Sequence, residues 1–111
     1  MSEGIKTVIY PVTDLARAKA AFRAVLGAEP VMDESYYVQF SVNGQAIGLD
    51  PRGHKSGAVG YFHVGDIKAT LQALLDTGAE VDQDIKDVGG GRLIAAVKDA
   101  DGNLIGLLQE A

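Results

Sequence analysis

The sequence contains no cysteine, no apolar run long enough to span a membrane, and no block of lysine or arginine. The absence of cysteine excludes disulfides, thiolate nucleophiles and cysteine-ligated metal, and it favours a cytoplasmic protein. A membrane-spanning helix needs about 18 or more consecutive apolar residues, so no membrane partner is expected. Ten basic residues lie scattered among fifteen acidic ones and leave a net charge of −5. Because nucleic acids are bound through clustered positive charge, they are not expected as partners either.

The composition is that of a folded globular domain. Apolar residues make up 47% of the chain and charged residues 23%, both near the averages of globular proteins. A length of 111 residues corresponds to about one domain. The opening residues, MSEGIKTV, place an acid before any base and lack the apolar core of a signal peptide, so none is expected there.

A repeat divides this domain into two halves. The segments GQAIGLD (Gly44–Asp50) and GNLIGLLQ (Gly102–Gln109) share the motif Gly-x-x-Ile-Gly-Leu. Upstream, the segments Tyr10–Val31 and Phe62–Val81 also resemble each other. The sequence therefore predicts a first module over about residues 4–50, a linker over 51–57 and a second module over about 58–109. Each module is predicted to run as a strand, a helix and then further strands.

Each half contains one amphipathic helix. In the first half the apolar face consists of Leu15, Ala18, Phe22, Val25 and Leu26. The second helix starts at Ile67, and the helices are expected to end at Gly27 and Gly78. Asp14 and Asp66 precede the helices and are expected to stabilise their N-termini rather than to take part in chemistry.

Strand patterns fill the remainder of each half. Alternation in YYVQFSV places one set of side chains, Tyr36, Val38, Phe40 and Val42, on one face, and Tyr37, Gln39 and Ser41 on the other. Asn43-Gly44 then predicts a tight hairpin turn. The second half repeats this design with strands over 92–98 and 103–108, joined by a turn.

The doubled pattern resembles the vicinal oxygen chelate superfamily, which includes glyoxalases, bleomycin-resistance proteins and extradiol dioxygenases. The resemblance rests on PVTDLARAKAAFRAVLG after the first strand and on DADGNLIGL in the last hairpin, and it extends over nearly the whole chain. It implies an α+β fold in which two βαβββ modules form curved mixed sheets around a cup, with the helices on the outer face. It also implies that the cup holds a divalent metal or a drug-sized ligand, and that the chain pairs as a homodimer.

The resemblance also implies where metal ligands would stand. Metal-dependent members take their ligands from the first and last strand of each module, which correspond here to Thr7, Gly48, Val59 and Gly106. A divalent metal needs several carboxylate, imidazole or amide donors, whereas these four positions supply at most one hydroxyl. We therefore expect neither metal nor other cofactor, no metal-dependent glyoxalase chemistry, and a wider cup at the two glycines. A glycine within a strand can equally mark a bulge or a close approach of two backbones.

Strand alternation suggests which side chains line the cup. If Thr7 and Val59 face it, the polar and aromatic residues that share this face become candidates for ligand binding. These candidates are Tyr37, Gln39, Asp50, Tyr61 and His63, together with Arg92 as an anchor for an anionic group. Structural roles are the alternatives, because tyrosine favours strands and a lone histidine is more often structural. His54, in the glycine-flanked linker, is expected to be solvated.

Two functions are consistent with these residues. The first is a binding protein that sequesters an amphipathic aromatic small molecule, as the bleomycin-resistance branch does by resemblance. The alternative is a metal-free isomerase or lyase in which His63 acts as acid or base and Tyr37 or Tyr61 polarises a carbonyl. We favour binding, because an apolar cup with a few polar groups is typical of small-molecule sites and the sequence shows no pair of ionisable groups that must converge.

Overall fold

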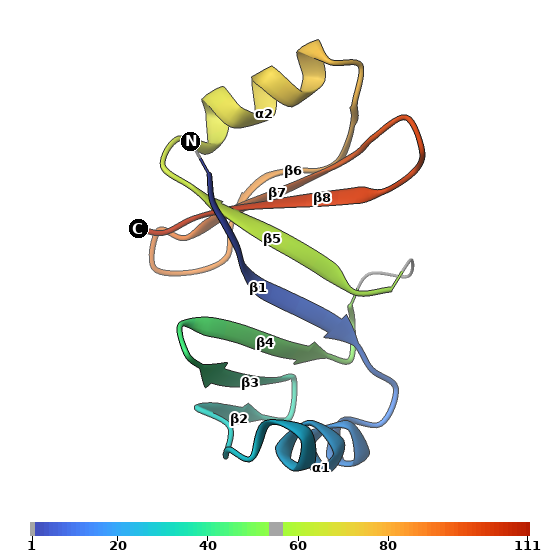
Figure 1. Ribbon diagram of the computed structural model, residues 1–111, viewed down its shortest axis with the longest axis vertical. Coiled ribbons are helices and arrows are strands. Elements are labelled where there is room, and N and C mark those ends of the chain that lie inside the picture. Colours follow the sequence, from blue (N-terminus) through green and yellow to red (C-terminus); the bar gives the residue numbers. More distant parts are fainter. Residues whose placement is uncertain (1, 54–56) are drawn as a thin grey trace. The chain divides into compact units, whose positions relative to one another are not determined.

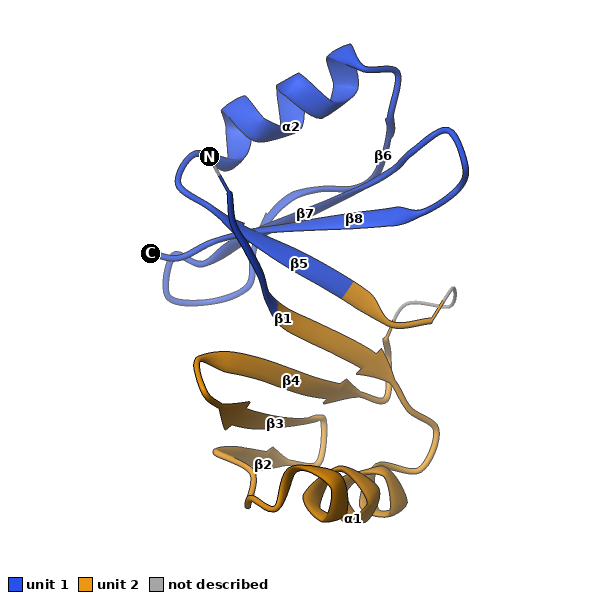
Figure 2. Cartoon of the chain, viewed as in Figure 1, with its two compact units in different colours: residues 1–6, 60–111 blue, residues 7–59 orange. Residues whose placement is uncertain are grey.

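The computed structural model describes residues 2–53 and 57–111, so His54 lies outside the described residues. The elements, shown in Figure 1, are β1 (Ser2–Pro11), α1 (Leu15–Leu26), β2 (Met32–Glu34), β3 (Tyr37–Val42), β4 (Gln45–Asp50), β5 (Val59–Val64), α2 (Ile67–Asp76), β6 (Glu80–Asp87), β7 (Leu93–Lys98) and β8 (Leu104–Gln109). The order strand, helix, three strands therefore occurs twice. The chain forms two compact units, residues 7–59 and residues 1–6 with 60–111 (Figure 2). Strand β1 thus contributes its first residues to one unit and its remainder to the other.

In the unit of residues 7–59, a four-stranded mixed sheet has the order β2-β3-β4-β1. Strands β1 and β4 are parallel, and the other pairs are antiparallel. Helix α1 packs against one face, where Val38, Phe40 and Leu49 are completely buried. The residues packed around them are Val12, Leu15, Ala18, Phe22, Leu26 and Ile47. The core of this unit therefore lies between the helix and one face of its sheet.

Two residues that the sequence pattern groups with the mainly apolar faces are exposed instead. Val25 is 75% exposed, because the helical period carries it about 80° around the axis from Leu15, to the margin of the apolar face. Tyr36 is 64% exposed. It precedes β3, which begins at Tyr37, so the alternation that holds within the strand does not apply to it. Both predictions were wrong, and each of the two residues lies at an end of an otherwise correct pattern.

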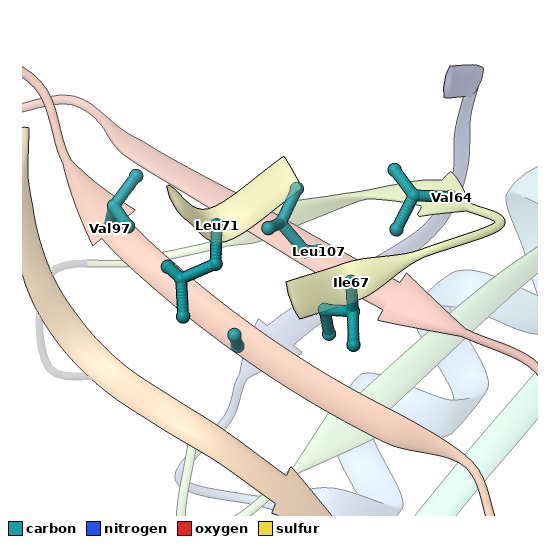
Figure 3. Packing of buried hydrophobic residues seen from close by; sticks show 6 residues of the cluster. Val64, Ile67, Leu71, Val97 and Leu107 are labelled. Atoms are coloured by element: carbon teal, nitrogen blue, oxygen red, sulfur yellow. The ribbon is translucent and has the colours of Figure 1, made fainter. Parts of the chain in front are cut away.

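In the other unit, β5, β8, β7 and β6 follow one another in the sheet, with β5 and β8 parallel and the other pairs antiparallel. Helix α2 covers one face of this sheet. The buried cluster beneath it, drawn in Figure 3, consists of Val64, Ile67, Leu71, Ala95, Val97 and Leu107. Strand β6 has two register irregularities against β7, between Val81 and Gln83 and between Gln83 and Lys86.

Local interactions fix the ends of the helices. The carboxylates of Asp14 and Asp66 each accept a hydrogen bond from a backbone N–H three residues on, at 3.0 and 3.1 Å, as expected of N-cap residues. Gly27 follows α1 as its C-cap, with a φ of 64°, as expected. Helix α2 ends at Asp76 with Thr77 as its C-cap, so the expected end at Gly78 was wrong by one residue.

The hairpin turns also follow the sequence. Asn43 and Gly44 have φ of 51° and 79°, the positive pair that a two-residue hairpin turn requires. In the turn before β8, Asp99 accepts hydrogen bonds from the backbone and side chain of Asn103, which lower the pKa of its carboxyl. The predicted α+β class with mixed sheets and a repeated strand and helix order is therefore confirmed. Among the described residues, no helix is long and apolar enough to cross a membrane.

Candidate functional site

The strand registers define the sheet face opposite the helix in each unit. Directly paired residues carry their side chains on the same face, and residues along a strand alternate. In the unit of residues 7–59, the pairings of Gly48 with Gln39 and with Ile9 therefore place these three residues on the face away from α1. We call this surface the first tyrosine face, and its residues are Thr7, Ile9, Pro11, Tyr37, Gln39, Ser41, Ala46, Gly48 and Asp50.

The other unit has a corresponding surface. The pairing of Tyr61 with Gly106, and of Gly106 with Ala96, places them opposite the cluster under α2. We call this surface the second tyrosine face, with Tyr61, His63, Ile94, Ala96, Lys98, Leu104, Gly106 and Leu108. The predicted strand parity is thus observed within each unit, since Phe62, between Tyr61 and His63, packs against the core under α2.

On the first tyrosine face, the side chain of Tyr37 lies over Gly48. A β-carbon at position 48 would lie 2.8 Å from Cζ and 3.0 Å from Cε1 of Tyr37, and still closer to its hydroxyl oxygen. Ordinary contacts between carbon atoms are about 3.5–4.0 Å long. The hydroxyl of Tyr37 also donates a hydrogen bond to Oε1 of Gln39, at 3.3 Å. The phenol of Tyr37 is therefore held against the backbone of β4.

On the second tyrosine face, Tyr61 lies against Gly106. A β-carbon at position 106 would lie 2.7 Å from Cδ1 of Tyr61 and 2.7 Å from the backbone oxygen of Gly60. Here both a ring and a neighbouring backbone require the glycine. The expectation that the two glycines widen the binding region is wrong, because tyrosine rings occupy the space above both. A close approach of two backbones, the alternative considered from the sequence, applies to Gly106, whereas at Gly48 the nearest atoms belong to the side chain of Tyr37.

His63 has an electrostatic interaction with a carboxylate that the sequence did not suggest. The pKa of the exposed Glu3 carboxyl is lowered, mainly by the hydrogen bond from Nζ of Lys6 at 2.8 Å and in smaller part by the charge of His63. Glu3 precedes His63 by sixty positions, and no motif or spacing links the two. Only the position of residues 1–6 within the unit that contains most of β5 could reveal this interaction.

The remaining candidates have local partners. Oδ1 of Asp50 accepts a hydrogen bond from the backbone N–H of Arg52 at 2.8 Å, which stabilises the turn after β4. Nε of Arg92 lies 3.1 Å from Oε1 of Glu110, and its side chain is 39% exposed. Thr7 and Val59 are buried, each with 4% of its surface exposed. Asp50 belongs to the first tyrosine face, whereas Arg92 precedes β7 and pairs with an acid beyond β8.

Comparison with solved structures supports the same fold at low sequence identity. A methylmalonyl-CoA epimerase from Streptomyces coelicolor, in complex with 2-nitronate-propionyl-CoA, is 22% identical with a TM-score of 0.77, over 100% of this chain and 99% of that one. A hypothetical protein from Bacillus halodurans C-125 is 15% identical with a TM-score of 0.79, over 96% and 94%. A glyoxalase/bleomycin resistance protein/dioxygenase superfamily member from Vibrio splendidus 12B01 is 18% identical with a TM-score of 0.72, over 99% and 100%.

Among curated proteins, none matches this chain. The sequence model of the Glyoxalase/Bleomycin resistance protein/Dioxygenase superfamily matches residues 4–107, which cover nearly all of both modules. The resemblance seen in the repeated motif is therefore confirmed. The chain belongs to the Glyoxalase/Bleomycin resistance protein/Dioxygenase superfamily.

Proposed function

We propose that this chain is a metal-independent member of its superfamily that binds, and thereby sequesters, an amphipathic aromatic small molecule. The observation that carries the proposal is the pair of tyrosine side chains lying over Gly48 and Gly106, two of the positions at which the family resemblance places metal ligands. In this chain the ring of a tyrosine occupies the space into which a metal-coordinating side chain at either position would project.

The chemistry of the four family positions supports metal independence. Thr7, Val59 and the two glycines provide one hydroxyl among them, and no carboxylate or imidazole. A divalent cation prefers several oxygen or nitrogen donors that converge on it, so these residues do not fit such an ion. We therefore derive no step of binding or catalysis through a metal.

The composition of the tyrosine faces supports an aromatic ligand. Tyr37, Gln39, Tyr61 and His63 are all half-buried, so that each presents part of its side chain to a ligand. They lie among apolar neighbours such as Ile9 and Leu108. Mostly apolar surfaces with a few polar groups are typical of small-molecule sites, and tyrosine adds both contact area and a hydrogen-bonding group.

Mass spectrometry of co-purifying molecules tests this proposal. The protein is purified without a tag under native conditions, and the bound fraction is extracted and compared with that of Tyr37→Ala and Tyr61→Ala. We expect an aromatic compound in the wild-type extract at a substantial molar ratio, and less of it in both variants. Tyr36→Ala is the matched control, because Tyr36 is exposed and lies outside the faces. An apolar compound without a ring, or equal recovery from all variants, would contradict the proposal.

A second candidate function is a metal-free isomerase or lyase. It is favoured by His63, a half-buried imidazole of the second tyrosine face whose charge contributes to lowering the pKa of the Glu3 carboxyl, because histidine is the side chain that most often acts as general acid or base. Two proteins of similar fold are methylmalonyl-CoA epimerases, from Streptomyces coelicolor and Mycobacterium tuberculosis. The test is incorporation of solvent deuterium into methylmalonyl-CoA. Incorporation that is lost in His63→Gln would support the isomerase, and wild-type incorporation no faster than that of the variant would exclude His63 as its base.

A further inference from the structure

The second tyrosine face continues onto the edge strand β6 at Lys86. Lys86 is the register partner of Ile94, and directly paired residues carry their side chains on the same face. The preceding residue, Ile85, packs against the cluster under α2, so alternation also places Lys86 on the opposite face. Ile94 pairs in turn with Leu108, and Leu108 with His63. One row of residues therefore runs from His63 on β5 to Lys86 on β6.

This row has an apolar middle and a cation at one end. Leu108 is buried, with 3% of its surface exposed, whereas Ile94 and His63 are half-buried and Lys86 is exposed. The row crosses three strand spacings, which corresponds to about 14 Å. An aromatic ring that covers Ile94 therefore lies next to the strand that carries Lys86, and an anionic group on the ring lies within reach of the ammonium.

The charge of Lys86 is not neutralised by the acids beside it in the sequence. Among the described residues, Lys86 forms no ion pair. Oδ1 of Asp84 accepts a hydrogen bond from the next backbone N–H at 2.8 Å, and Oδ1 of Asp87 accepts one from the backbone N–H two residues on, at 2.7 Å. Asp87 also pairs with Leu93, which packs against the cluster under α2, so Asp87 lies on the other face.

The other cations of β7 and its margin have acids beside them. Arg92, the anchor for an anionic group expected from the sequence, has its Nε 3.1 Å from Oε1 of Glu110. Lys98, also on the second tyrosine face, has Glu80 as its register partner on β6. Lys86 is therefore the cation best suited to an anionic ligand.

We propose that Lys86 anchors the carboxylate of the ligand, so that the second tyrosine face takes an ionised aromatic carboxylic acid. This inference rests on the proposed binding function, and it adds the chemical class of the ligand. The ammonium donates a charge-assisted hydrogen bond to the carboxylate, while the ring covers Ile94. The first tyrosine face has Asp50 and no lysine or arginine among its residues, so it disfavours the acidic end of such a ligand.

The ligand class is tested by titration with 2-naphthoate and 2-naphthamide, which share a ring system and differ in charge. We expect the wild type to bind 2-naphthoate more tightly, although the net charge of −5 by itself would favour the neutral amide. Lys86→Gln should weaken binding of 2-naphthoate about three- to ten-fold, between the loss of an exposed ion pair and that of a charge-assisted hydrogen bond. It should leave binding of 2-naphthamide unchanged. Lys86→Arg keeps the charge and should retain the preference.

Lys68→Gln is the matched control. Lys68 is an exposed lysine of α2, which covers the opposite face of the same sheet, and the substitution removes the same charge. This variant should bind both probes as the wild type does. Equal weakening of 2-naphthoate binding in Lys68→Gln and Lys86→Gln would reveal a general effect of protein charge and would overturn the anchoring role of Lys86.

A second measurement locates the carboxylate directly. The lysines are dimethylated with carbon-13, which keeps their charge, and Lys86→Arg and Lys68→Gln assign two of the methyl resonances by NMR. Saturation with 2-naphthoate is expected to shift the Lys86 resonance and to leave that of Lys68 in place. A Lys86 resonance that does not move when 2-naphthoate is bound would overturn the inference.

The outcomes separate this inference from the function on which it rests. Wild-type preference for 2-naphthamide, or unchanged affinity for 2-naphthoate in Lys86→Gln, would overturn the ligand class and leave a binding protein for aromatic molecules. Failure of the wild type to bind either probe would count against both the binding function and this inference.

Discussion

Replacing Gly106 with alanine tests whether a backbone contact, and not only a ring, requires this glycine. The β-carbon would lie 2.7 Å from the carbonyl oxygen of Gly60 and 2.7 Å from Cδ1 of Tyr61. Tyr61 is the direct register partner of Gly106, so Gly60 lies on the neighbouring strand β5. Relieving the contact therefore requires β5 to move relative to β8, by about 0.5–1 Å if ordinary contact distances are to be restored.

The magnitude follows from two opposing effects. Excess volume in a well-packed region costs about 1–3 kcal/mol, and replacing glycine by alanine in a strand gains about 0.5–1 kcal/mol. We expect Gly106→Ala to lower the free energy of unfolding by about 1–2 kcal/mol. Gly60→Ala is the matched control, because its β-carbon would meet only Ile5 side-chain atoms, the nearest at 3.4 Å. It should be neutral or slightly stabilising.

Urea unfolding followed by far-UV circular dichroism measures both variants, and a second background identifies the cause. In Tyr61→Ala the ring is gone but the carbonyl of Gly60 remains, so Gly106→Ala should still destabilise. If Gly106→Ala is as stable as Gly60→Ala, the contact is not restrictive and the reasoning fails. If Tyr61→Ala removes the whole penalty, the ring alone is responsible and the backbone explanation is refuted.

Three further predictions concern metal, assembly and packing. Elemental analysis of the untagged protein should find no stoichiometric nickel, zinc, iron or manganese, and a chelator should leave the Tm unchanged; a stoichiometric ion would contradict metal independence. Sedimentation at micromolar concentration should give about twice the chain mass of 11.6 kDa, because covering the half-exposed apolar residues of the tyrosine faces removes apolar surface from water. A strict monomer would refute the homodimer. Phe62→Ala should lower the free energy of unfolding by about 2–3 kcal/mol, which is at or below the low end for a fully buried phenylalanine because Phe62 is only partly buried. His63→Ala should lower it by about 1 kcal/mol or less. Thermal melts that reverse this order would contradict the assignment of Phe62 and His63 to opposite faces of β5.

Features that depend on neighbouring residues could be predicted from the sequence. The N-caps at Asp14 and Asp66 and the Asn43-Gly44 turn follow from side-chain and backbone preferences over a few positions. The two faces of each sheet follow from alternation, which is a property of the strand itself. The errors fell at element ends, at Val25 and Tyr36, where periodicity gives no information on how far the packing partner extends.

The candidate site could be predicted only in part, because its contacts join residues on different strands. Alternation placed Tyr37 and Gly48 on one face, but it did not indicate that the ring crosses to the neighbouring strand and covers the glycine. That contact depends on the register of β3 against β4 and on the rotamer of the ring. Glu3 and His63 are related only through the position of residues 1–6 within the unit of β5. No local pattern contains this information.

The two glycines of the repeated motif also show that equal sequence does not imply an equal constraint. At Gly48 the nearest atoms belong to the far end of one side chain, which can rotate away. At Gly106 a backbone oxygen is as close as the ring, and it can move only with its strand. Replacement of Gly48 should therefore act mainly on the position of Tyr37, and so on ligand binding. Replacement of Gly106 should act mainly on stability, so each copy of the motif limits a different property of the protein.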